Sequence, residues 1–197
     1  MQIDLTDPTA VLIATSLALE HAGLQAAAFG GLALAMYGEP RETKDADLVV
    51  AGLNVAQAEA ALRSQGFDLI RAFEEVQFGG LLVSRLTLIG GKSGSLNVVD
   101  LVEPRSSQYA GDVQARALTA LLRDKAVRVV APEDFIVLKL LATRERDLED
   151  ARTVMKSLHA QLDMNLIETL LKTLSTEISD YDFMTRWLSV KAVLSES

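Results

Sequence analysis

The chain has 197 residues, of which 49% are hydrophobic and 23% are charged, and its formal net charge is −8. This length allows one sizeable domain, or a compact domain with a helical appendage. The acidic balance excludes a general grip on a nucleic-acid backbone, which needs clustered Lys and Arg, although it leaves room for a local basic groove.

Residue types that are scarce exclude further classes of site. The sequence contains no cysteine, so disulfides and thiolate metal sites are excluded. Its two histidines, His21 and His159, lack ligand spacing, so histidine-based zinc chemistry and a Ser-His-Asp triad are not expected. The first residues do not resemble a signal peptide, and the most apolar run, 22–37, is interrupted and short for a spanning helix. We therefore expect a cytoplasmic protein without a membrane partner.

The first part of the chain alternates between helices and strands. Asp7, followed by Pro8, is typical of a helix start, and Asn54 is a second candidate N-cap. Apolar spacing and glycines set the other boundaries. In chain order we expect a helix over 8–23, a strand over 25–29, a helix over 32–37, a strand over 47–51 and a helix over 55–65.

The middle of the chain is rich in strands, and its end is helical. Residues 91–93 lack the glycine of a P-loop five positions earlier, where Leu86 stands, so we interpret 90–94 as a hairpin turn from which Lys92 can reach a site. We expect strands over 69–72, 76–78, 82–89 and 96–102, a helix over 113–122 and a strand over 127–130. Further helices are expected over 132–143, 148–158, 165–174 and 182–194.

This order of elements predicts an α+β fold. We expect a mixed β-sheet with flanking helices over residues 1–131, followed by a C-terminal helical subdomain over 132–197.

Two aspartates, Asp45 and Asp47, open the strand that follows the glycine pair. Side chains alternate across a strand, so these carboxylates share one face and can hold one or two divalent ions. Such a pair alone is more often a solvated strand edge. Asp100 strengthens the pattern, because it interrupts an apolar strand, where a charge is costly unless it is paired or bound to a metal. If the two strands pair, three carboxylates converge for two-metal phosphoryl chemistry; otherwise Asp100 only ends its strand.

Gly30 and Gly31 stand at the mouth of a helix. Their small size would let phosphate oxygens reach the N–H groups of that helix, and a tight turn is the simpler alternative. Lys139 lies inside an apolar helix, where a lysine must pair, reach solvent or face a cleft. Asp147 resembles an N-cap, with Asp150 three positions later. A cap with surface ion pairs explains the nearby Arg146 and Glu149 well but explains Lys139 poorly.

The combined pattern resembles the DNA polymerase β-like nucleotidyltransferase superfamily. The residues that carry the resemblance are Gly30, Gly31, Arg41, Thr43, Lys44, Asp45, Asp47 and Asp100. Residues 132–134, Lys139 and 146–150 make the chain similar to the AbiEii-like branch, which includes toxins of toxin–antitoxin systems. The resemblance covers about residues 25–154.

The resemblance implies an enzyme that uses Mg2+, one or two ions, to move a nucleoside monophosphate from an NTP to an acceptor hydroxyl. The acceptor would be a tRNA end, a protein or a small molecule, and an antitoxin would be a protein partner. It implies metal ligands at Asp45, Asp47 and Asp100, which with Lys139 form the catalytic set. It implies nucleotide contacts at Gly30, Gly31, Thr43, Lys44 and Lys139, and supporting roles for Arg41, Arg144, Asp147 and Asp150.

One residue departs from the family pattern. Leu32 stands where a Ser or Thr hydroxyl commonly follows the glycine pair. This favours an alternative, a non-catalytic module on the same fold that binds nucleotide or a partner, although the intact set of Asp45, Asp47 and Asp100 argues against it. A further alternative is a structural subunit that dimerises through an exposed apolar face of the last helix, formed by Phe183, Trp187, Leu188 and Leu194.

Overall fold

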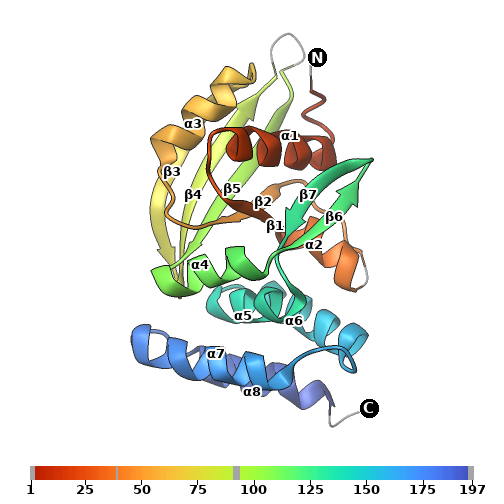
Figure 1. The fold of residues 1–197 in the computed structure, drawn as a ribbon, viewed down its shortest axis with the longest axis vertical. Coiled ribbons are helices and arrows are strands. Elements are labelled where there is room, and N and C mark those ends of the chain that lie inside the picture. Colours follow the sequence, from red (N-terminus) through yellow and green to blue (C-terminus); the bar gives the residue numbers. More distant parts are fainter. Residues whose placement is uncertain (1–2, 39, 91–93, 195–197) are drawn as a thin grey trace.

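The computed structural model of the chain describes residues 3–38, 40–90 and 94–194. Its centre is a seven-stranded mixed sheet with the strand order β3-β4-β5-β2-β1-β7-β6 (Figure 1). The strands are β1 (Ala26–Phe29), β2 (Ala46–Val50), β3 (Asp68–Phe78), β4 (Leu81–Ile89), β5 (Leu96–Pro104), β6 (Leu118–Leu122) and β7 (Lys125–Val129). β2 is parallel to β5 and antiparallel to β1, and β1 is parallel to β7.

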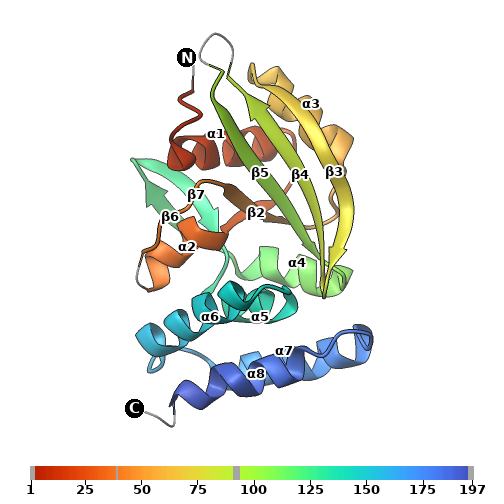
Figure 2. The same ribbon diagram turned by 180° about the vertical axis from the view of Figure 1, so that it is seen from behind.

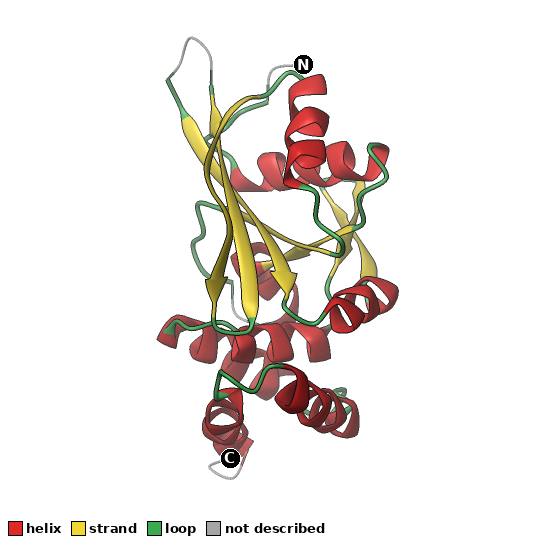
Figure 3. Ribbon diagram, turned by 90° about the vertical axis from the view of Figure 1, so that its left-hand side faces the viewer, coloured by secondary structure: helices red, strands yellow, loops and turns green. Residues whose placement is uncertain are grey.

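Helices cover one face of the sheet and one of its ends. The helices are α1 (Pro8–His21), α2 (Gly30–Tyr37), α3 (Val55–Ser64), α4 (Ser107–Arg116), α5 (Pro132–Leu141), α6 (Glu145–Leu158), α7 (Met164–Glu177) and α8 (Phe183–Lys191), followed by a 3-10 turn (Ala192–Leu194). Helices α1 and α3 lie on the same face of the strands in Figures 1 and 2. Helices α5 and α6 lie at one end of the sheet, and α7 and α8 form a further layer beyond them (Figure 3).

The expected α+β fold is confirmed, and local sequence signals account for several boundaries. Asp7 accepts hydrogen bonds from the backbone N–H groups of Thr9 and Ala10, and Asn54 accepts one from that of Gln57. These contacts satisfy donors that the first turn of a helix leaves unpaired. Both expected N-caps are therefore present.

The expected helix over 113–122 is wrong. Helix α4 begins earlier, after the N-cap Ser106, and ends at Arg116. Strand β6 then pairs with β7 through a turn in which Arg123 and Asp124 have φ values of 48° and 63°. The apolar residues around 113–122 fit a helix as well as a strand, and the pairing with β7 decides between them. Likewise, the two strand pieces expected over 69–78 form one strand, β3, whose pairing with β4 is interrupted by register shifts.

The expected apolar face of the last helix is also wrong in part. Phe183 and Trp187 are buried, and Leu194 is half-buried against the core, so only Leu188 is exposed, at 66%. Phe183 and Trp187 belong to the same apolar cluster as the sheet, and Leu194 packs against it. The division into residues 1–131 and 132–197 stays a prediction, and this cluster contains residues from both parts.

Among the helices of the described residues, none is both long and apolar enough to span a membrane. The turn residues 91–93, including Lys92, lie outside the described residues.

Candidate active site

Asp47 and Asp100 lie next to each other on neighbouring parallel strands. The register of β2 and β5 pairs Asp47 with Asp100, and Asp45 directly precedes β2. Asp45 and Asp47 are half-buried, whereas Asp100 is buried in the middle of β5 rather than ending the strand at the surface. The pairing of these two strands therefore brings the predicted carboxylates to one region of the sheet.

The surroundings of Asp47 make its charge costly. Burial, and then the negative charge of Asp100, raise the pKa of Asp47 to about 6, and Asp45 acts in the same direction. Lys139 and Arg144 oppose this rise but do not cancel it. Near neutral pH the ionised carboxylate therefore gains stability from any cation placed beside it.

Asp100 is already paired with an arginine that the sequence reasoning did not identify. Arg85 lies on β4 directly opposite Asp100, and its Nε and Nη2 donate to the two carboxylate oxygens at 2.8 and 2.7 Å. The guanidinium also lies 5.4 Å from the centre of the Phe73 ring. Counting equally from both sides of the turn expected at 90–94 would place Arg85 opposite Val99. The observed register pairs Ile89 with Leu96, one residue further along, and this shift brings Arg85 opposite Asp100.

The glycine pair permits close contacts with the strand and loop that follow it. Gly30 has a φ of 64°, and a Cβ there would overlap the carboxylate of Asp47. A Cβ on Gly31 would lie 2.8 Å from the Cβ of Thr43 and 3.2 Å from Nη1 of Arg41. Glycine is therefore required at both positions to bring these side chains against the start of α2.

Five charged residues of alternating sign form a continuous chain, which we call the charge chain: Arg41, Asp150, Lys139, Asp147 and Arg144. The ammonium of Lys139 lies 2.9 Å from Asp147 and 2.8 Å from Asp150. Arg41 donates two hydrogen bonds of 2.9 Å to Asp150, and Arg144 donates one of 3.1 Å to Asp147. The charge chain thus joins the loop after α2 to α5 and α6.

Lys139 is the buried centre of this chain. Its side chain is 1% exposed, and its ammonium lies 4.9 Å from the ring centre of Phe29 and 5.5 Å from that of Phe135. The two carboxylates neutralise this ammonium, so a phosphate would have to compete with these ion pairs. The Lys139 side chain therefore neither reaches solvent nor lies free in a cleft, because it is paired.

The expected N-cap role of Asp147 is wrong. Helix α6 begins at Glu145 after Arg144, which makes no side-chain cap hydrogen bond, and Asp147 lies inside the first turn. Its carboxylate faces Lys139 and Arg144 instead of the helix N–H groups. Burial acts to raise the pKa of Asp147, but these two cations outweigh burial and hold the pKa below its usual value.

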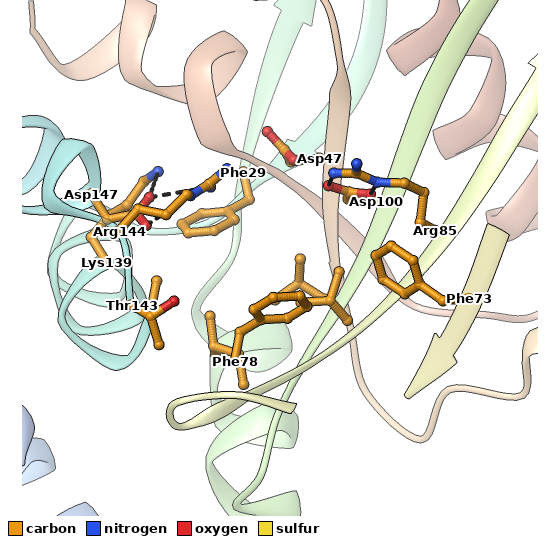
Figure 4. Close-up of a pocket in the computed structure, with 14 residues that line it drawn as sticks. Phe29, Asp47, Phe73, Phe78, Arg85, Asp100, Lys139, Thr143, Arg144 and Asp147 are labelled. Atoms are coloured by element: carbon orange, nitrogen blue, oxygen red, sulfur yellow. Dashed lines mark hydrogen bonds and ion pairs between the residues drawn. The ribbon is translucent and has the colours of Figure 1, made fainter. Parts of the chain in front are cut away.

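Two cavities meet at Asp47. One, the charged cavity, has a volume of about 370 Å3 and is lined by Arg41, Glu42, Thr43, Lys44, Asp45, Asp47, Arg144, Arg146 and Asp147. The other, the aromatic cavity, has a volume of about 300 Å3 and is lined by Phe29, Asp47, Phe73, Phe78, Leu81, Val83, Arg85, Asp100, Val102, Lys139, Ala142, Thr143, Arg144 and Asp147. Figure 4 shows the aromatic cavity with the Arg85–Asp100 pair at one end and Arg144, Asp147 and Lys139 at the other.

The polar groups of the charged cavity are partly uncommitted. Lys44 and Arg146 are exposed, and neither has a hydrogen bond or ion pair within the described part of the chain. The same holds for the carboxylates of Asp45 and Asp47. Leu32 is half-buried against the apolar core and lines neither of these two cavities.

The carboxylates do not form a complete metal site in this arrangement. Within residues 3–38, 40–90 and 94–194, no three His, Asp or Glu side chains gather closely enough to hold an ion. Asp100 is turned to Arg85, which leaves Asp45 and Asp47 as the free donors. Two free carboxylates at the edge of a cavity fit a magnesium ion, which in proteins often has one or two carboxylate ligands and completes its shell with water.

Comparison with known proteins identifies related sequences and folds. The family model described as "Nucleotidyltransferase of unknown function (DUF6036)" matches residues 13–193. A search of curated proteins gave no significant match.

Three solved structures share the fold. The first is an antigenic nucleotidyltransferase-like protein from Paracoccidioides brasiliensis, with 17% identity, a TM-score of 0.51 and coverage of 87% of this chain and 88% of that one. The antibiotic-resistance factor ANT(2'')-Ia has 16% identity, a TM-score of 0.53 and coverage of 96% and 97%. A nucleotidyltransferase-type protein from Helicobacter pylori has 17% identity, a TM-score of 0.50 and coverage of 92% and 80%.

Proposed function

The chain belongs to the nucleotidyltransferase family DUF6036, and on this premise we propose that it moves a nucleoside monophosphate from an NTP to an acceptor hydroxyl and releases pyrophosphate. The observation that carries the proposal is the position of Asp47. This carboxylate lies beside Asp100, against Gly30, and at the boundary between a charged and an aromatic cavity.

The charged cavity is the proposed site for the phosphates. Lys44 and Arg146 supply positive charge that no carboxylate of the described residues pairs with. Arg144, which lines both cavities, adds a third cation. Thr43 supplies a hydroxyl beside Gly31, where a hydroxyl is missing from Leu32. No side chain caps the N-terminus of α2 within the described residues, so the N–H groups at Gly30 and Gly31 are candidates for phosphate contacts.

Asp45 and Asp47 are the proposed ligands of one or two magnesium ions. When bound, magnesium would offset the charge of the phosphates and polarise the reacting phosphate. Asp100 is the proposed third carboxylate, and it has to exchange Arg85 for that role. The charge chain supports a positioning role for Lys139, because this lysine fixes α6 and, through Asp150 and Arg41, the loop that carries Asp45.

The acceptor of this proposed reaction is a tRNA end, a protein or a small molecule. Membership of the AbiEii-like branch, an antitoxin partner and a homodimer also stay predictions. The Arg85–Asp100 pair favours a second candidate function, a module that binds nucleotide without transferring it, because Arg85 competes for the carboxylate oxygens that would ligate a metal or accept a proton.

A labelling experiment tests transfer directly. The protein is incubated with each NTP labelled at the α-phosphate, with magnesium, and with total cellular RNA or a lysate. We expect label to move to an acceptor with the wild type and with an Asp68→Asn, Asp124→Asn control. Asp68 and Asp124 are exposed, and neither lines the charged or the aromatic cavity. The Asp45→Asn, Asp47→Asn variant should transfer none. Nucleotide-dependent thermal stabilisation of the wild type without any label transfer would instead support the binding module.

A further inference from the structure

The aromatic cavity has a predominantly apolar lining. Three phenylalanine rings and four aliphatic side chains form most of it: Phe29, Phe73, Phe78, Leu81, Val83, Val102 and Ala142. The rings come from β1 and from both halves of β3, so the cavity lies between the long strands and the start of the helical layer (Figure 4). A cavity of about 300 Å3 is at the small end of ligand pockets, which suits a compact molecule.

The charged groups around the aromatic cavity are almost all committed to one another. Asp100 accepts both of its hydrogen bonds from Arg85, at one end. At the other end, Asp147 is paired with Lys139 and Arg144. Among the carboxylates of this lining, all of which belong to described residues, only Asp47 forms no hydrogen bond or ion pair.

Because these charged groups are already paired, they limit the kinds of ligand that the aromatic cavity can bind. A molecule with several ammonium groups would need several free carboxylates, and the lining offers one. A nucleic-acid end would bring phosphates to a cavity whose cations already hold carboxylates, at a desolvation cost that the apolar walls do not offset. A neutral molecule with an apolar body and one or two polar groups fits this lining, because it adds no charge that would need a partner there.

The position of the cavity indicates which substrate it would hold. Asp47, Arg144 and Asp147 line both cavities and therefore form their shared border. In phosphoryl transfer the attacking and leaving oxygens lie roughly in line on opposite sides of the phosphorus. With the pyrophosphate portion in the charged cavity, the attacking oxygen arrives from the aromatic side of this border.

We infer that the aromatic cavity is the acceptor site, and that the acceptor is a compact, neutral alcohol or phenol with an aromatic or aliphatic body. This inference rests on the proposed function. In the step itself, the acceptor oxygen bonds to the α-phosphorus, and the bond from the α-phosphorus to the bridging oxygen breaks. Pyrophosphate leaves with that electron pair, and the hydroxyl proton passes to water. Thr143, which has an exposed hydroxyl on the lining, is in place to orient the ligand.

A binding experiment with a defined probe tests the site apart from catalysis. The probe is 4-(trifluoromethyl)benzyl alcohol, and its fluorine NMR line broadening is titrated against the full chain. Phe73 and Ile70 offer a matched pair of apolar residues on β3, of which only Phe73 lines the cavity. We expect Ile70→Ala to bind the probe like the wild type and Phe73→Ala to bind it about tenfold more weakly. Val83→Thr, which keeps the side-chain shape, should also weaken binding. Equal binding by all four proteins overturns the inference.

A nucleotide analogue shows whether the aromatic cavity holds the acceptor or the nucleobase. The α,β-methylene analogue of each NTP is added with magnesium, and the acceptor site predicts that the probe stays bound. Displacement of the probe by an analogue would mean that the nucleobase occupies the cavity, which overturns the inference. Binding of kanamycin or of a CCA-ending RNA oligonucleotide in place of the probe overturns it as well.

The two proposals can fail separately. Label transfer to cellular RNA that the probe does not inhibit would leave the proposed function standing and refute the acceptor class. If no analogue binds and no NTP transfers label, the proposed function is refuted and the acceptor role falls with it. Probe binding that depends on Phe73 would in that case show a binding site that has no role as an acceptor site.

Discussion

Replacing Lys139 by methionine removes the only ammonium between two buried carboxylates, Asp147 and Asp150, whose side chains are 2% and 3% exposed. Removing one partner from a buried ion pair costs about 3–5 kcal/mol, because an uncompensated charge stays in a poorly solvated place. Arg144 and Arg41 still contact these carboxylates, so we expect the whole loss to stay within this range rather than to double. In a chain of this size, each kcal/mol corresponds to about 2–4 °C in Tm.

The assay is urea unfolding followed by circular dichroism, together with thermal unfolding. Lys191→Met is the matched control, since Lys191 forms an ion pair with Glu168 at the surface and should lose no more than about 1 kcal/mol. The triple variant Lys139→Met, Asp147→Asn, Asp150→Asn removes the stranded charges and should recover part of the lost free energy of unfolding.

The reasoning would be refuted by a small effect on folding. If Lys139→Met lowers the free energy of unfolding by less than about 1 kcal/mol, yet abolishes nucleotide binding, the ammonium acts on the ligand rather than on the charge chain. A triple variant less stable than the single variant would likewise show that the carboxylates stabilise the fold without the lysine.

Three further predictions concern the carboxylates and the glycine pair. Asp47→Asn should raise the free energy of unfolding by about 1 kcal/mol near neutral pH, allowing for solvent screening of a half-buried group, because the raised pKa of about 6 means that folding favours the protonated form. This gain should shrink as the pH falls through about 6 and vanish below about pH 3, where the wild-type carboxyl is protonated in both states, and a pH series of urea midpoints checks it. Gly30→Ala should lose about 2 kcal/mol or more, whereas Gly52→Ala, at the same φ of 64° but with open space around it, should lose about 1 kcal/mol; equal losses would argue against contact with Asp47. Arg85→Met frees Asp100 and should tighten Mn2+ binding about tenfold, measured by water proton relaxation, with Asp100→Asn cancelling the gain.

The sequence predicts the parts of the site that local periodicity determines. Strand alternation places Asp45 and Asp47 on one face, and the apolar neighbours of Asp100 indicate that its charge needs a partner. The N-caps Asp7 and Asn54 are predicted for the same reason, since a cap bonds within its own first turn.

Contacts between distant segments could not be predicted in this way. Arg41 and Asp150 are far apart in sequence, and nothing local to either residue indicates the other. The helix expected over 113–122 failed for a related reason, because its second half takes its conformation from the pairing of β6 with β7. The Arg85–Asp100 pair also depends on strand pairing, because a register one residue different from the observed one would place Arg85 opposite Val99.

The distribution of charge in the site bears on whether Leu32 makes the protein a non-catalytic module. The carboxylates that contact the chain's own cations, Asp100, Asp147 and Asp150, are buried, whereas the unpaired Asp45 and Asp47 face a cavity together with the unpaired Lys44 and Arg146. Unpaired charges of both signs around one cavity match a ligand that also carries both signs, as a metal–triphosphate complex does. Leu32 packs against the core, and Thr43 places a hydroxyl in the charged cavity beside Gly31. We therefore propose that the hydroxyl of Thr43, on the loop that Arg41 anchors, takes the place of the one that Leu32 lacks.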